Sequence, residues 1–160
     1  MSFMIRPLFV AALFFMLSAA AHADEFQTRF GQFEIGAEHN LLFAGRPLSP
    51  PVQGNSGLAI LEVHQVGKTD LVLLMDTGGL ACPFQFSVLT VQAAGVSVSP
   101  SFGTCAEALV VKKLPRGFYL SMTGFFGPAA SARDHARARR QKHVFQFIDG
   151  VVTENGKILK

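Results

Sequence analysis

Two cysteines have the most constrained chemistry in this chain. Cys82 and Cys105 are its only cysteines. They do not form a C-x-x-C motif, and no histidine lies near either one in sequence, so the spacing favours neither a metal site nor a catalytic thiol. In an oxidising compartment an isolated pair forms a disulfide. Such a bond would close a loop of about 24 residues and would stabilise the fold by roughly 3 kcal/mol.

Three arginines form the candidate binding face. Arg133, Arg137 and Arg140 are spaced by four and three residues, which places them on one flank of a predicted helix. Each guanidinium presents a planar set of donors that suits phosphate, sulfate or carboxylate groups. The alternative interpretation is a solvated helix flank with no ligand.

A third chemical feature lies at the end of a predicted strand. Leu73-Leu74-Met75 is followed by Asp76-Thr77-Gly78-Gly79. This segment resembles the active-site triplet of the aspartic proteases, whose chemistry needs two carboxylates that share one proton. The resemblance implies a homodimer that supplies the second Asp76, as in the retroviral enzymes. It departs from the family at Gly79, where a small residue with a side chain is usual.

The alternative for Asp76 is a turn in which the carboxylate accepts hydrogen bonds and the glycines adopt positive φ. We take the turn as the main interpretation, so the sequence assigns no catalytic residue. It predicts no cofactor and no metal either, because the histidines of the mature chain lack the spacing of metal ligands. These are His39, His64, His135 and His143.

The first 23 residues predict export. Arg6 precedes an apolar run from Pro7 to Ala20, and Ala21-His22-Ala23 then matches a small-x-small cleavage site. The run is too short to span a membrane, and no twin arginine precedes it. The sequence therefore predicts a Sec-type signal peptide over residues 1–23, cleavage after Ala23, and a periplasmic or secreted protein without a transmembrane segment.

The remaining residues, 24–160, predict a single β-rich domain. Short alternating or apolar runs separated by turn signals indicate an antiparallel meander of about eight strands, closed as a small barrel or folded as a sandwich. One helix is expected from Pro128 to about Lys142, followed by a β-hairpin. Its small residues predict a stripe that docks on the sheet, formed by Ala129, Ala132 and Ala136.

Charge is distributed unevenly along the mature chain. The segment from Asp24 to Glu107 carries three basic and eight acidic residues, whereas the segment from Ala108 to Lys142 carries eight basic residues and one acidic residue. The overall excess of positive charge is too small to predict a nucleic-acid partner. Either the basic helix lies over an acidic sheet within the protein, or it meets an anionic partner.

These features predict a small exported, disulfide-stabilised β-domain that acts by binding, not by catalysis. Its partner would be an envelope protein or an anionic envelope ligand. The alternative function is an aspartic-protease-like hydrolase that uses Asp76 in a homodimer. The sequence leaves the ligand and the oligomeric state open.

Overall fold

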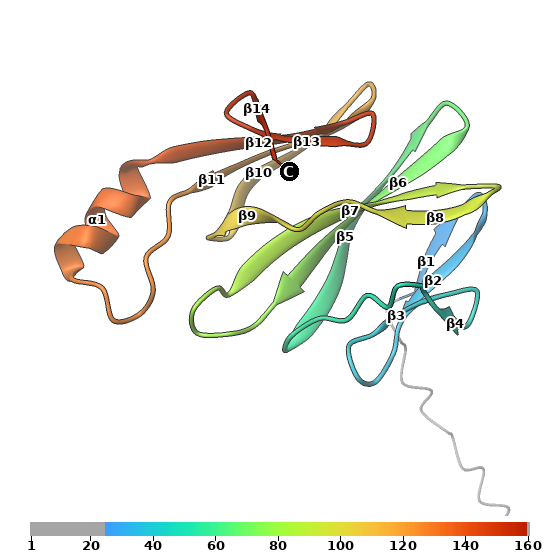
Figure 1. Cartoon of the computed structure of the whole chain (residues 1–160), viewed down its shortest axis with the longest axis horizontal. Coiled ribbons are helices and arrows are strands. Elements are labelled where there is room, and N and C mark those ends of the chain that lie inside the picture. The colour runs from blue at the N-terminus through green and yellow to red at the C-terminus, as the bar shows by residue number, and fades with distance from the viewer. Residues whose placement is uncertain (1–24, 160) are drawn as a thin grey trace, which may run out of the picture.

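The computed structural model describes residues 25–159, which form three antiparallel sheets and one helix (Figure 1). The predicted signal peptide, residues 1–23, lies outside the described residues. The predicted class, mainly β with antiparallel pairing and a late helix followed by a hairpin, is confirmed. Closure into a small barrel is not observed, because none of the three sheets closes on itself.

The N-terminal sheet is a small four-stranded meander. Its strands are β1 (Glu25–Thr28), β2 (Gly31–Ile35), β3 (Leu41–Phe43) and β4 (Arg46–Pro47).

The central sheet contains the longest strands of the described chain. Its members are β5 (Gly57–Val66), β6 (Thr69–Thr77), β7 (Phe84–Gln92) and β8 (Gly95–Val98), with β9 (Phe102–Cys105) also paired to β7.

The C-terminal sheet has the order β10-β11-β12-β13-β14, and the helix α1 (Ala132–Arg140) is inserted between β11 and β12. The strands are β10 (Ala108–Leu114), β11 (Gly117–Thr123), β12 (Lys142–Ile148), β13 (Val151–Glu154) and β14 (Lys157–Ile158).

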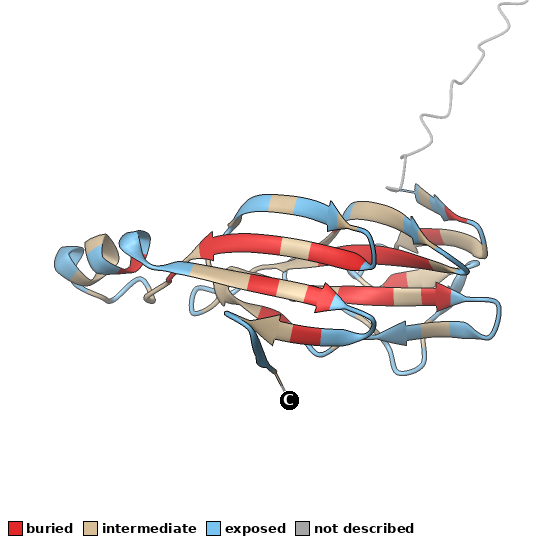
Figure 2. Cartoon of the chain, turned by 90° about the horizontal axis from the view of Figure 1, so that it is seen from above, coloured by how far each residue is buried: buried red, intermediate tan, exposed pale blue. Residues whose placement is uncertain are grey.

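The central sheet is covered on both faces, which explains the apolar run in β6. Leu71 and Leu73 belong to a cluster shared with the C-terminal sheet, whereas Val72 and Leu74 belong to a second cluster shared with the N-terminal sheet. A strand buried on both sides has no face for polar residues, so its sequence is continuously apolar. Figure 2 shows buried segments concentrated on the inner strands, with exposed residues on the outer ones.

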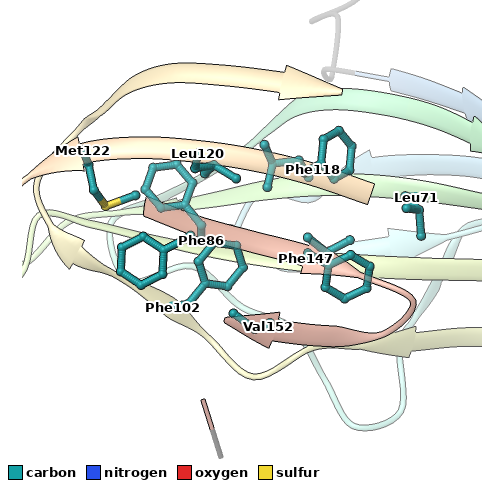
Figure 3. Close-up of a cluster of buried hydrophobic side chains, with 11 residues drawn as sticks. Leu71, Phe86, Phe102, Phe118, Leu120, Met122, Phe147 and Val152 are labelled. Carbon is teal, nitrogen blue, oxygen red and sulfur yellow. The ribbon is translucent and has the colours of Figure 1, made fainter. Parts of the chain in front are cut away.

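Phenylalanine dominates the cluster between the central and C-terminal sheets. Phe86 and Phe102 come from the central sheet and point toward strands of the C-terminal sheet, as Figure 3 shows. The ring of Phe102 lies 5.7 Å from that of Phe145 on β12 and 6.3 Å from that of Phe86, measured between centroids. These separations suit the offset and edge contacts that aromatic pairs prefer.

The helix is shorter than the sequence predicted. It begins at Ala132 and not at Pro128, because Ser131 is the N-cap and its hydroxyl accepts a hydrogen bond from the Asp134 N–H at 3.2 Å. It ends at Arg140, and Lys142 instead pairs with Thr123 as the first residue of β12.

The predicted docking stripe of Ala129, Ala132 and Ala136 is wrong. Ala138 is the buried helix residue, and its carbonyl accepts a hydrogen bond from the Gly124 N–H at 3.1 Å. The last turn of the helix is thus the part that contacts the chain leaving β11. The helix therefore lies at one end of the molecule, beyond the sheets (Figure 1).

Candidate functional site

Arg133, Arg137 and Arg140 border a single hollow on one flank of α1. Its volume is about 740 Å³. Ser131, Asp134, Ala136 and Gln141 complete the lining. We call this surface the arginine hollow. The helical period brings these side chains together, so the local sequence is sufficient to place them.

The three arginines differ in their partners. Arg137 forms an ion pair with Asp134, with 3.1 Å between Nη2 and Oδ1, and its guanidinium carbon lies 5.2 Å from the centre of the Phe126 ring. Arg133 and Arg140 have no ion pair within residues 25–159. One arginine is therefore held in place, and two have donors available to a bound anion.

A second concave surface lies on the opposite flank of α1. It has a volume of about 250 Å³ and is bordered by the helix, the β11–α1 loop, the start of β7 and the end of β9. We call it the phenylalanine groove, and it is lined by Pro83, Phe84, Cys105, Ala106, Glu107, Thr123, Gly124, Phe125, Phe126, His135, Ala138 and Arg139. Sequence reasoning missed it, although two adjacent phenylalanines before Gly127-Pro128 are a local signal for an aromatic loop.

The predicted disulfide is confirmed and supports the groove. Cys82 in the β6–β7 loop is bonded to Cys105 at the end of β9, and their Cα atoms are 4.6 Å apart. The bond joins two segments that both border the groove. A disulfide is also typical of proteins that fold in an oxidising compartment.

Asp76 lies near the end of β6, where its carboxylate is a hydrogen-bond acceptor. Its Oδ1 accepts the N–H of Asn55 at 2.7 Å, and its cross-strand neighbours are Leu58 and Gln85, neither of which is a carboxylate. Gly78 and Gly79 follow with φ of 122° and 88°, values that favour glycine. This geometry matches the turn interpretation of the Asp-Thr-Gly segment.

Asp76→Asn should therefore be nearly neutral, because the amide oxygen can still accept the Asn55 N–H. We expect the free energy of unfolding to change by less than about 0.5 kcal/mol, whereas Asp76→Ala should cost about 0.5–1.5 kcal/mol through the lost acceptor. Urea denaturation of the three proteins measures both values. Equal destabilisation by asparagine and alanine would show that the charge of Asp76 matters, and not its acceptor oxygen.

Of the four histidines within residues 25–159, two make side-chain polar contacts. His64 Nε2 lies 2.7 Å from the carbonyl of Leu114 and links β5 to β10, and His143 Nδ1 lies 2.7 Å from Glu154 Oε1. His135 borders the phenylalanine groove. Within residues 25–159, no three His, Cys, Asp or Glu side chains are grouped closely enough to hold a metal ion.

The other large cavity, of about 400 Å³, lies between the central and C-terminal sheets at their turns. Several of its polar groups bind one another: the Gln92 amide donates to the Thr69 hydroxyl at 3.2 Å, and Arg116 forms an ion pair with Asp149. The charged groups of this cavity are thus already paired. The arginine hollow is the better candidate for an anion site.

Comparison with protein families, curated proteins and solved structures finds no match. α1, with nine residues, is the only helix in the described part of the chain, and no helix there is long and apolar enough to cross a membrane.

Proposed function

We propose that the mature chain is an exported, non-catalytic β-domain that binds an anionic group through Arg133, Arg137 and Arg140. One observation carries the proposal: the three arginines border one hollow, and the only carboxylate in its lining is Asp134. Guanidinium groups bind carboxylate, phosphate and sulfate through paired hydrogen bonds. The anion would belong to an envelope protein or an envelope polymer, since an exported domain seldom meets nucleic acid.

The position of α1 favours an external partner over internal charge pairing. The helix lies at the opposite end of the molecule from the N-terminal sheet (Figure 1), so it does not cover the acidic N-terminal strands. From Thr123 to Lys142 the chain has five basic residues and one acidic residue. Clustered positive charge of this kind attracts anionic partners and raises their association rate.

Replacing all three arginines with glutamine should weaken anion binding at least about tenfold. Hexaglutamate is a suitable probe, titrated into the mature protein at low and high salt. In the wild type, NMR shifts should be confined to amides of residues 131–141, and affinity should fall as salt rises because exposed charges are screened over about 8 Å at physiological ionic strength. The triple variant should keep its thermal stability, since exposed charges contribute little to it.

A matched control removes the same charge elsewhere. Arg46, Lys68 and Lys157 are exposed, and within residues 25–159 none of them forms an ion pair. Their triple glutamine variant should bind hexaglutamate within about twofold of the wild type, because only weak long-range attraction is lost. Equal weakening in both variants would show that net charge, and not the arginine hollow, attracts the probe.

We also propose that the chain is exported, is cleaved after Ala23 and folds outside the cytoplasm. The Ala21-His22-Ala23 site and the Cys82–Cys105 disulfide support this. N-terminal sequencing of protein recovered from outside the cytoplasm should find Asp24 as the first residue. Recovery of the chain with Met1 retained and both thiols free would contradict the proposal.

A further inference from the structure

The phenylalanine groove has the size of one side chain. Its volume of about 250 Å³ is below the range of about 300–1,000 Å³ typical of small-molecule sites. Protein interfaces, by contrast, concentrate binding energy in single apolar or aromatic side chains that enter well-formed pockets. The walls suit such an anchor, because Phe84, Phe125 and Phe126 contribute aromatic surface and Ala138 leaves space beside them.

The groove and the arginine hollow are parts of one surface. α1 separates them, with Ala138 and Arg139 on the groove side and Arg133 and Arg140 on the other. Phe126 contacts both parts of this surface. It lines the groove, and the centre of its ring lies 5.2 Å from the guanidinium carbon of Arg137, which borders the hollow. A polypeptide segment that crosses α1 would meet both.

The walls of the groove are held by contacts that do not involve a ligand. The Cys82–Cys105 disulfide fixes the β6–β7 loop to β9, and the Thr104 hydroxyl donates to the carbonyl of Thr123 at 2.6 Å. The Gly124 N–H bonded to Ala138 fixes the helix to the β11–α1 loop. A preformed pocket loses little conformational entropy when an anchor enters it.

We infer that this surface binds an acidic protein segment, with one aromatic or large aliphatic side chain in the phenylalanine groove and flanking carboxylates on the arginines. Charge complementarity selects the acidic residues, and the volume of the groove selects a single apolar anchor. The inference rests on the proposed function, since it adds an anchor beside an anion site. It identifies the partner as a protein and not as a free anion or a lipid.

Two synthetic peptides test the anchor. Both carry four glutamates around a central position, which is phenylalanine in one and serine in the other. The phenylalanine peptide should bind the wild type at least about tenfold more tightly. It alone should shift the NMR amide signals of Ala106, Phe125 and Phe126, whereas both peptides should shift those of residues 131–141.

A variant that fills the groove tests whether the preference for the phenylalanine peptide arises there. Ala106 is half-buried in the groove wall, so Ala106→Leu should abolish the preference for phenylalanine while leaving the affinity for the serine peptide unchanged. Ala132→Leu is the control, because Ala132 is exposed on α1 and lines neither surface. The NMR shifts of the wild type decide the question independently if Ala106→Leu fails to fold.

The remaining outcomes separate the two proposals. If both peptides bound with equal affinity and both lost it in the triple arginine variant, the inference of an apolar anchor would be wrong, and the proposed anion site would be supported. A preference for phenylalanine that survives in a folded Ala106→Leu variant would also overturn it. Binding of neither peptide would overturn both proposals. Binding to phosphatidylglycerol vesicles but to neither peptide would replace the protein partner with a membrane surface.

Discussion

Replacing Arg29 with methionine should lower the free energy of unfolding by about 3 kcal/mol, the lower end of the range for breaking a buried ion pair. Arg29, in the β1–β2 turn, donates from Nε to Asp70 Oδ1 at 2.7 Å, and its own backbone N–H donates to Oδ2 at 2.7 Å. Asp70 is fully buried, whereas the side chain of Arg29 is 38% exposed. The variant leaves a buried carboxylate without its cation, and water entering where the arginine stood limits the loss.

Urea denaturation followed by far-UV circular dichroism measures this change, since the chain has no tryptophan. Arg46→Met is the matched control, because Arg46 is exposed on β4, and it should cost less than about 0.5 kcal/mol. A double variant, Arg29→Met with Asp70→Leu, should recover most of the stability, because no unpaired charge remains. If Arg29→Met were as mild as Arg46→Met, the ion pair would not contribute to joining the first two sheets.

Removing the disulfide should have the second large effect on stability. Cys82→Ser with Cys105→Ser should lower the free energy of unfolding by about 3 kcal/mol, because the unfolded chain regains the entropy of a closed loop. The bond spans 23 residues of sequence. The loss should appear as a lower urea midpoint with the native fold retained.

The same variant tests whether the disulfide shapes the binding surface. Cys105 borders the phenylalanine groove, whereas the arginine hollow contains neither cysteine. We expect weaker binding of the phenylalanine peptide and unchanged binding of hexaglutamate. Thiol titration of the denatured, unreduced wild type should find no free thiol, and two free thiols would contradict the bond itself.

The sequence by itself determined those structural features that depend on residues close to one another in the chain. The predicted strand that contains Leu73-Leu74-Met75 is observed as β6. The spacing of Arg133, Arg137 and Arg140 placed them on one flank, because the helical period is a local property. The cysteine pairing was also accessible, since two cysteines allow only one intramolecular bond.

The start of α1 was a local feature that sequence reasoning nonetheless missed. Ser131 and Asp134 have the spacing of a capping pair, and their side chains do bond across the first turn, at 2.7 Å. The predicted helix begins at Pro128 instead. The structure places Pro128 in the turn before the helix, and the buried helix residue is Ala138, which is not part of the predicted alanine stripe.

Only the tertiary structure decided what depends on segments far apart in the chain. Arg29 and Asp70 are 41 residues apart, and they meet only because the N-terminal sheet packs on the central one. The phenylalanine groove likewise draws on Phe84, Ala106, Phe125 and Ala138. Side-chain periodicity tells which face of an element is apolar, but it contains no information about which other element covers that face. Packing of the three sheets and the disulfide supplied that information, and so created the groove beside arginines that the sequence had already aligned.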